Sequence, residues 1–417
     1  MTLTISKKMA TFTSRLTAGQ NPYQQKALQH LEEMEFPTTR DEYWKYTRLG
    51  KITNTAFELG ESLTHKSINA FLTCEHYLTI GQGIIRDDLS HFTELPIVVE
   101  RTFPSTYATS AVRNQEKASI FTTINDAFFR EELVITIPKG VVMEQPLQLL
   151  LLNEGERVMN APRVRIIAEA SSEATIIISN VCTDDHTQFS NVLVELDVAA
   201  NAKLDVQNIQ STNASHLNVT TIDARQMADS RLAINTYTLN GLLIRNNINI
   251  AVEGQNAETH MNGMLVTKDK QHVDNHTFVD HKVSNCFSNE NYKYVLDGQS
   301  TGVFNGKVIV RPDAQVINAY QNNGNILLSD KATVDSKPEL EIYADDVKCS
   351  HGSTTGQLDE SALFYLQTRG ISKKKAEKML VSAFIGEVLE TIKDDKTRSF
   401  VLGYLEKEHG WDQNIVI

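Results

Sequence analysis

The sequence lacks the features that would direct a protein into a membrane or onto a nucleic acid. Residues 1–19 contain no apolar segment of the kind found in signal peptides. The longest apolar run, around 147–152, is far too short to cross a bilayer. The formal net charge of −12 disfavours general binding to nucleic acid or to an anionic membrane. We therefore expect a cytoplasmic protein that has no nucleic-acid partner and does not insert into membranes.

Cysteine is scarce, and its spacing excludes the common cysteine motifs. The four cysteines, Cys74, Cys182, Cys286 and Cys349, are widely separated and form no CxxC pair. Neither a zinc ribbon nor a thioredoxin-like redox motif is therefore available. In a reducing compartment all four should be free thiols, and we predict no cofactor that is intrinsic to the chain.

Between about residues 132 and 346 the sequence consists mainly of short β-rich runs. Polar turns rich in Asn, Asp, Ser and Gly separate these runs. The clearest runs lie at 133–137, 164–167, 175–178, 192–196 and 244–250. No helical pattern between them is long enough for a βαβ crossover, so a mainly β fold is expected.

A small residue opens a strand at regular intervals in this region. Ala174, Ala202, Ala228, Ala257 and Ala314 are separated by 28, 26, 29 and 57 residues, and the last interval spans about two periods. Such periods are typical of solenoids, in which each coil buries its inner face on the next. The pattern favours a parallel β-helix, with a jelly roll or β-sandwich as the alternative.

Helical patterns flank the β-rich region, so we predict three domains. These are a mixed, partly helical domain at 1–131, a parallel β-helix core at 132–355 and a helical domain at 356–417, of a kind that often caps a solenoid or docks a partner. In the first domain, Tyr23 to Met34 has the spacing of an amphipathic helix.

The C-terminal domain contains clear helix boundaries. Asp359 can cap a helix that runs to Thr368, and Gly370 is well placed just beyond its end. Ser372 can then cap a longer helix. We expect that helix to bury one apolar stripe, which consists of Ala376, Met379, Leu380, Ala383, Phe384 and Val388.

Three histidines form the first candidate metal site. His272 and His276 would share one face of a strand with Asp274, and His281 follows closely. Imidazole and carboxylate both bind iron or zinc. Hydrogen bonding along the polar turns of the solenoid is the favoured interpretation, because no third ligand on a rigid element is evident.

The second candidate site is the pair Cys349 and His351, which lies where the β-rich region meets the C-terminal helices. On an extended backbone both side chains would point to one side. Thiolate and neutral imidazole are good ligands for iron, zinc or an iron–sulfur cluster. Two ligands do not close a tetrahedral site, so this site would need ligands from another chain. A purely structural Cys-x-His pair is the alternative, and a Cys–His nucleophile is disfavoured because no oxyanion hole is visible.

Several longer motifs resemble the SufB/SufD family of iron–sulfur cluster assembly proteins, and its SufD branch more than its SufB branch. The strongest is Lys-Pro-Glu-Leu-Glu-Ile-Tyr-Ala-Asp-Asp-Val-Lys-Cys-Ser-His-Gly at 337–352. Further similar segments lie at 36–47, 302–307, 314–329 and 363–371. One departure is Ser-Thr-Thr-Gly at 353–356, where the family more often has Ala-Thr-Val-Gly.

The resemblance implies a fold, partners and a site. The fold is a right-handed parallel β-helix core flanked by N-terminal and C-terminal helical domains. Members pair with SufB through the β-helix and carry one SufC ATPase on the C-terminal helices. Cys349 and His351 would lie at the SufB–SufD junction and hold transient iron or a nascent cluster shared with SufB. The implied SufC-binding residues are Leu363, Phe364, Tyr365, Leu366, Arg369, Gly370 and Ile371.

On this basis we expect a non-catalytic scaffold, with ATP hydrolysis supplied by SufC. Two alternatives remain. One is a self-associating β-helix scaffold, for which a homodimer of the isolated chain would be typical. The other is a carbohydrate-active β-helix enzyme, which the low aromatic content of 7% disfavours because sugar subsites are usually aromatic.

Overall fold

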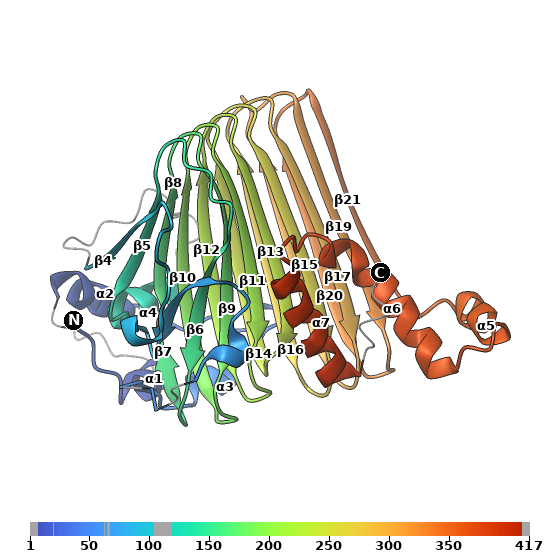
Figure 1. Cartoon of the computed structure of the whole chain (residues 1–417), viewed down its shortest axis with the longest axis horizontal. Coiled ribbons are helices and arrows are strands. Elements are labelled where there is room, and N and C mark those ends of the chain that lie inside the picture. Colours follow the sequence, from blue (N-terminus) through green and yellow to red (C-terminus); the bar gives the residue numbers. More distant parts are fainter. Residues whose placement is uncertain (1–6, 20, 62, 65–66, 104–118, 411–417) are drawn as a thin grey trace.

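Stacked parallel strands in two sheets form the body of the protein (Figure 1). The computed structural model describes residues 7–19, 21–61, 63–64, 67–103 and 119–410. From residue 163 onward successive strands alternate between the two sheets, which we call sheet A and sheet B, so each coil contributes one strand to each. The chain is 44% strand and 21% helix, with a β-solenoid of about eight turns and helices at both ends. The predicted fold class is therefore confirmed.

The elements of the described residues have the following bounds. Sheet A contains, in spatial order, β20 (Thr333–Ile342), β18 (Thr301–Val310), β16 (His272–His281), β14 (Leu243–Val252), β12 (Leu217–Gln226), β10 (Gln188–Val198), β8 (Arg163–Ala168), β5 (Glu132–Ile137) and β4 (Val98–Thr102), with β7 (Val158–Asn160) and β1 (Glu58–Leu59) beside β10. Sheet B contains β21 (Val347–Gly356), β19 (Ile317–Leu327), β17 (Phe287–Leu296), β15 (Glu258–Thr267), β13 (Arg231–Asn240), β11 (Lys203–Ser211), β9 (Glu173–Cys182), β6 (Leu147–Asn153), β2 (His76–Gly81) and β3 (Ile84–Ile85). The helices are α1 (Lys7–Thr13), α2 (Pro22–Glu32), η1 (Glu42–Trp44), α3 (Gly50–Thr53), η2 (Asn69–Phe71), η3 (Asp87–Leu89), α4 (Ile120–Phe128), α5 (Glu360–Thr368), α6 (Lys373–Leu389) and α7 (Asp395–His409).

The predicted repeat has the correct period, but its register is only partly right. Backbone carbonyls at equivalent positions of successive coils accept hydrogen bonds from the next coil, and these positions are Ser172, Ala202, Ser230, Ala257 and Cys286. Ala202 and Ala257 therefore occupy the repeat position, whereas Ala174 and Ala228 lie two residues away from it. Cys286 fills the period that had no alanine.

Polar residues in a left-handed conformation make the turns between coils tight. Asn201, Asp229, Asn256, Asp269 and Asn285 all have φ between 56° and 61°. Asn and Asp tolerate this conformation better than most residues, because their short side chains bond to the local backbone. The Asn- and Asp-rich turns of the sequence thus have a direct structural purpose.

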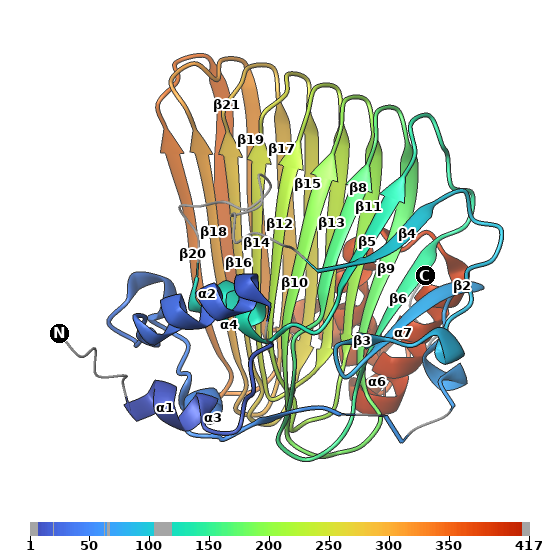
Figure 2. The ribbon, with the colours of Figure 1, turned by 90° about the vertical axis from the view of Figure 1, so that its left-hand side faces the viewer.

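An N-terminal helical layer covers the outer face of sheet A (Figure 2). Phe12, Leu31 and Phe121 pack against Phe189 and Leu217 of the sheet. Strands from the same part of the chain also extend the solenoid, because β2 pairs with β6 and β4 pairs with β5. The domain boundaries at 131 and 355 stay a prediction, and part of the first domain, 104–118, lies outside the described residues.

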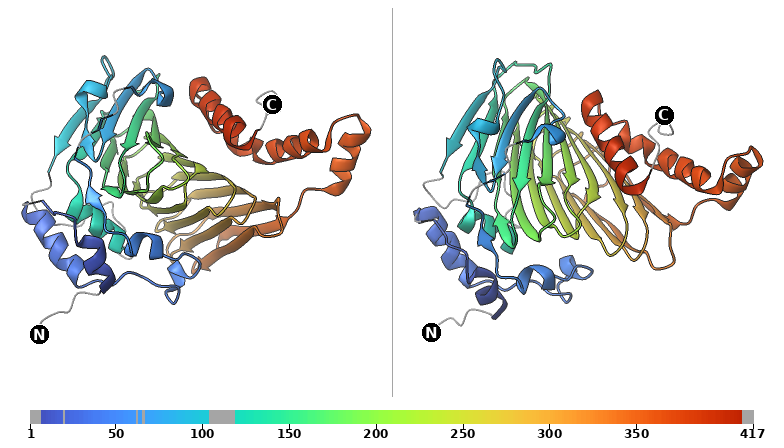
Figure 3. Two further views of the ribbon diagram at one scale, coloured as in Figure 1. Left: turned by 90° about the horizontal axis from the view of Figure 1, so that it is seen from below. Right: turned by 60° about the horizontal axis from the view of Figure 1, so that its bottom comes forward.

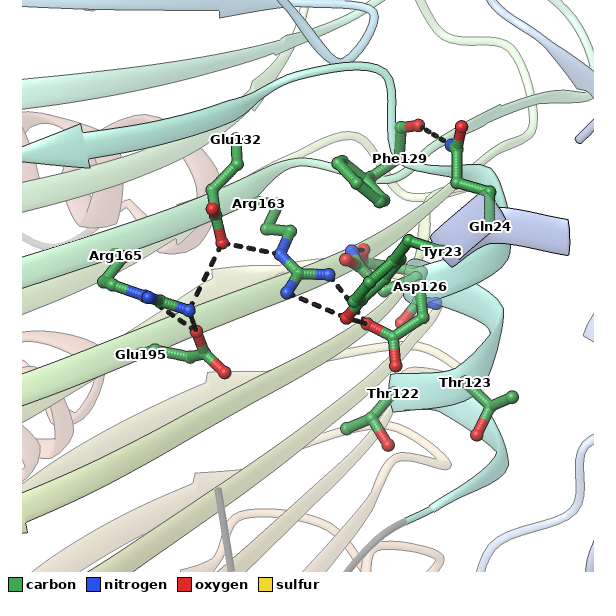
Figure 4. A network of polar contacts seen from close by, with 12 residues as sticks. Tyr23, Gln24, Thr122, Thr123, Asp126, Phe129, Glu132, Arg163, Arg165 and Glu195 are labelled. Atoms are coloured by element: carbon green, nitrogen blue, oxygen red, sulfur yellow. Dashed lines mark hydrogen bonds and ion pairs between the residues drawn. The ribbon is translucent and has the colours of Figure 1, made fainter. Parts of the chain in front are cut away.

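A buried ion network fixes this layer to the solenoid (Figure 4). Arg163 of β8 donates to Asp126 Oδ1 of α4 at 2.7 Å and to Glu132 Oε1 of β5 at 2.9 Å. It also donates to the hydroxyl of Tyr23 on α2 at 3.1 Å. Both the guanidinium and its two carboxylates are almost inaccessible to water.

The C-terminal helices α6 and α7 pack on the outer face of sheet B (Figure 1). Val381 and Ile385 contact a cluster that includes Tyr237, Met264 and Val295 of the strands. Of the stripe predicted for α6, Ala376 and Val388 are buried as expected, but Ala383 is exposed. The predicted face was therefore partly wrong, because α6 lies along the sheet with a different side turned inward.

The two ends of the solenoid differ. At the N-terminal end, β3 and β4 run antiparallel to their neighbours, and Phe92, Leu95 and Ile97 pack against the interior core. The C-terminal end has no corresponding cover among the described residues. None of the helices in the described ranges has the length and apolar character needed to span a bilayer.

Candidate metal centre at the open end of the solenoid

The last strand of each sheet pairs with a neighbour on one side only. In the described part of the chain, β20 pairs with β18 and β21 pairs with β19. The residues of β20 are mostly half-buried, and those of β21 are mostly exposed. This end of the solenoid therefore presents two free strand edges and an uncovered interior face.

Cys349 and His351 both face the interior at this open end. Cys349 is half-buried and packs against the main core. Ser353, on the same face of β21, donates to Ser336 Oγ of β20 at 2.8 Å across the interior. His351 lies between these two positions, so the strand alternation places it on that face as well. Its side chain is exposed because no further coil covers it.

The Cys349 thiol is protonated in the absence of a metal. Burial raises its pKa, and a hydrogen bond from the backbone of Ala319 opposes this only in part. A metal ion would therefore have to displace the thiol proton when it binds.

Two further polar residues lie behind His351 in the same interior column. Gln321 of β19 is the in-register partner of His351, and Glu290 of β17 is the partner of Gln321. Gln321 Nε2 donates to Glu290 Oε1 at 3.3 Å, and Thr277 Oγ1 donates to Glu290 Oε2 at 2.7 Å. Burial raises the pKa of Glu290 to about 7, although both hydrogen bonds favour its charged form.

Sequence reasoning missed Gln321 and Glu290 as site residues. Gln321 lies in the 314–329 segment, which resembles the family but contains no ligand pattern of its own. Strand alternation could have placed Gln321 on an interior face, but only the register between coils shows that it stacks under His351. Among the described residues, no three His, Cys, Asp or Glu side chains are grouped closely enough to hold a metal ion.

The histidines are engaged in hydrogen bonds, as the favoured interpretation predicted, but they lie on strand β16 and not along polar turns. His272, Asp274 and His276 share the outer face of sheet A. His272 Nε2 lies 2.8 Å from Thr47 Oγ1, and His276 Nε2 lies 3.0 Å from Asp274 Oδ1. His281 faces the interior, where its Nε2 lies 3.0 Å from the hydroxyl of Ser288.

Asp274 is the centre of a clamp that holds the 36–47 motif. Arg245 Nη1 donates to Asp274 Oδ2 at 2.5 Å, and the Thr47 hydroxyl donates to the same oxygen. The Arg245 guanidinium stacks on the ring of Trp44 with its carbon 4.0 Å from the centroid. Trp44 and Thr47 of this motif thus secure the N-terminal layer on sheet A.

The residues predicted to bind an ATPase lie on α5 and directly after it. These are Leu363, Phe364, Tyr365, Leu366, Arg369, Gly370 and Ile371. The helix has no buried residue and extends away from the solenoid (Figures 1 and 3). Phe364 is 67% exposed and Tyr365 is 56% exposed. Gly370 has φ of 81°, which fits its predicted position after the helix end.

All four cysteines are free. Burial raises the pKa of Cys74 to about 11 and that of Cys182 to about 12. Cys182 Sγ lies 3.4 Å from His216 Nδ1, and burial lowers the pKa of that histidine to about 3. Both members of this pair are therefore neutral, so the contact is a hydrogen bond between uncharged groups rather than an ion pair.

Comparison with known proteins gives a consistent result. Residues 150–384, more than half of the chain, match the family model described as "SUF system FeS cluster assembly, SufBD core domain". The chain is 28% identical to the iron–sulfur cluster assembly protein SufD of Escherichia coli over 393 residues, which cover 92% of this chain and 91% of that protein. It is 29% identical to a SufBD family protein of Synechocystis over 87% of this chain and 85% of that protein. It is 24% identical to SufD of Bacillus subtilis over 92% of each chain.

Proposed function

The chain belongs to the SufBD family of iron–sulfur cluster assembly proteins, and we propose that it is a non-catalytic, SufD-like scaffold subunit. It would pair with SufB, dock the SufC ATPase and assist iron loading or cluster formation at the SufB–SufD junction. The observation that carries the proposal is the open end of the solenoid, where Cys349 and His351 face an uncovered interior. Family membership gives no support to a carbohydrate-active enzyme.

The free edge of β21 is suited to pairing with another solenoid. Unpaired backbone N–H and C=O groups along an edge strand readily accept a further strand. A partner that covers β20 and β21 would also enclose Cys349 and His351. That partner could supply the ligands that these two residues need for a closed metal site.

Helix α5 supports the docking of SufC. Large exposed aromatic side chains such as Phe364 and Tyr365 are typical anchors of protein interfaces. Arg369 stacks on the Tyr365 ring, 5.3 Å from its centroid, and donates to its hydroxyl at 3.2 Å. This contact orders the ring before a partner binds, which lowers the entropic cost of association.

A short connection would couple the ATPase to the metal site. Strand β21 ends at Gly356 and α5 begins at Glu360. A movement of SufC on binding or hydrolysing ATP would therefore act on β21 through only three intervening residues. In this mechanism the movement opens the junction and exposes His351 as a neutral imidazole ligand and Cys349 as a thiolate.

Co-purification tests the partner assignments. The full chain would be tagged and co-expressed with the SufB and SufC proteins of the same source. We expect both to co-elute, and deletion of 356–417 should remove only SufC. If the chain elutes without either protein, the partner assignments fail and the self-associating scaffold becomes the better description.

Substitution of His351 tests the site. We expect His351→Ala to reduce the iron–sulfur cluster content of the assembled complex while its circular dichroism spectrum stays unchanged. Lys348→Ala is the matched control, because Lys348 is exposed on the opposite face of the same strand. Normal cluster content in the His351→Ala complex would refute the site assignment.

A further inference from the structure

The polar column behind His351 is short and ends within the solenoid. His351, Gln321 and Glu290 occupy successive coils of sheet B in register. In-register residues on one face of a parallel sheet lie about 4.8 Å apart from strand to strand. The next position inward is Met261, which is completely buried and apolar. The column therefore connects with the outside only through the end that carries His351.

The side-chain amide of Gln321 donates a hydrogen bond through its nitrogen, but its oxygen accepts none from the described residues. Nε2 donates to Glu290 Oε1. With its NH2 group toward Glu290, the amide turns its carbonyl oxygen elsewhere. Gln321 is 3% exposed, and its buried Oε1 has no hydrogen-bond partner within the described part of the chain. Such an oxygen costs about 1–3 kcal/mol unless something binds to it.

The part of the opposite wall nearest to Gln321 offers no side-chain donor. Gly306 of β18 approaches so closely that an added Cβ would lie 3.0 Å from Gln321 Nε2. Its neighbour on β20 is Pro338, which has no N–H group. The open end, where His351 is the in-register neighbour of Gln321, is the side from which a group outside the solenoid could reach Gln321 Oε1.

We propose that Gln321 Oε1 is a third ligand for the metal bound by Cys349 and His351, and that Glu290 is the positioning residue that orients it. The inference rests on the proposed function, because it concerns the same metal. An amide oxygen, an imidazole and a thiolate together form a mixed donor set of the kind that Fe²⁺ accepts. A partner chain would then complete a tetrahedral site with one ligand instead of two.

The charges in this arrangement balance. When Fe²⁺ binds, the Cys349 thiol forms the Fe–S bond and releases its proton to water. Any proton on Glu290 is released as well, so that the thiolate and the Glu290 carboxylate together offset the two positive charges of the metal. Buried ions are tolerated in a protein interior when they are compensated in this way.

Titration of the full chain with Co²⁺ under anaerobic conditions tests the proposal. A thiolate-to-cobalt charge-transfer band reports Cys349, and the intensity of the d–d bands reports the coordination number. We expect the free wild-type chain to bind one Co²⁺, because three ligands come from this chain. Gln321→Leu should weaken binding at least tenfold, whereas Gln321→Glu, which keeps a ligating oxygen, should bind within about threefold of wild type.

Two more variants separate ligation from folding. Glu290→Gln should weaken binding about tenfold, because Gln321 loses the carboxylate that orients it. Asn322→Leu replaces an exposed amide beside Gln321 and should leave the affinity unchanged. Circular dichroism of each variant establishes that the solenoid is intact.

The outcomes distinguish this inference from the proposed function. If the free wild-type chain does not bind Co²⁺, or if Gln321→Leu binds as tightly as wild type, Gln321 is not a ligand and the inference is wrong. The proposed function would survive either result, provided that His351→Ala still lowers the cluster content of the assembled complex. Normal cluster content in that complex would refute the function, whatever Gln321→Leu does.

Discussion

Removal of Arg163 should loosen the N-terminal layer without unfolding the solenoid. In an Arg163→Met variant, Asp126 and Glu132 lose the guanidinium that lies 2.7 and 2.9 Å from them. Both carboxylates are buried. Deletion of one partner of a buried ion pair costs about 3–5 kcal/mol. Because the network joins α2 and α4 to the sheet, we expect most of this loss in the local opening of those helices.

Amide hydrogen exchange measures this local loss directly. A loss of about 3–5 kcal/mol corresponds to exchange in α2 and α4 that is faster by roughly a hundredfold to a few thousandfold. Amides of β14 and β16, which lie deeper in the solenoid, should change little. Arg231→Met is the control, because Arg231 is exposed and its surface pair with Glu258 should contribute at most about 1 kcal/mol.

A combined variant checks the electrostatic reason for the effect. Asp126→Asn and Glu132→Gln, added to Arg163→Met, remove the two buried charges that were left behind. This triple variant should recover part of the lost protection. If Arg163→Met accelerates exchange less than about fivefold, or if the triple variant is no better protected than the single one, the network does not hold the layer in the way we describe.

Two other substitutions test buried carboxylates. The pKa of Glu290 is raised from 4.5 to about 7. Between these two pH values the native state keeps a proton that the unfolded state has lost. The free energy of unfolding therefore falls as the pH rises through this range. The free energy of unfolding of Glu290→Gln relative to wild type, measured by urea denaturation, should therefore rise by on the order of 3 kcal/mol between pH 4 and pH 8. A difference that does not change with pH would contradict this. Burial would raise the pKa of Asp274, but Arg245 and His276 lower it below 3.8. The ionised carboxylate of Asp274 therefore stabilises the fold above that pH, and this stabilisation is lost as the pH falls. Asp274→Asn should cost about 3–5 kcal/mol at pH 7, and an equal cost at pH 3 would count against the clamp.

The sequence was informative about the fold because solenoid coils repeat both their strands and their turns. Asn and Asp at the turns and small residues near the strand starts recur once per coil, and both follow from backbone geometry that every coil shares. The face of α6 could not be predicted, because the helix has apolar residues on several sides. Contact with Tyr237 and Met264 of sheet B decides which of them are buried.

The candidate site likewise combines residues that the sequence alone can place together and residues that it cannot. Cys349 and His351 are two residues apart on one strand, so alternation alone predicted that they share a face. Gln321 and Glu290 come from other coils, and the spacing between paired residues varies. Leu217 and Leu243 are 26 residues apart, whereas Thr301 and Thr333 are 32 apart. Because coil lengths differ in this way, the interior columns could be identified only from the strand register.

The difference between the two ends of the solenoid bears on how the chain could assemble end to end. A rod with two free ends can add neighbours without limit and grow into a fibre. Here Phe92, Leu95 and Ile97 pack against the core at one end, whereas the described residues leave the interior open at the other. A pair that joins through β20 and β21 would therefore cover both open interiors and turn the two N-terminal ends, with these apolar side chains, outward.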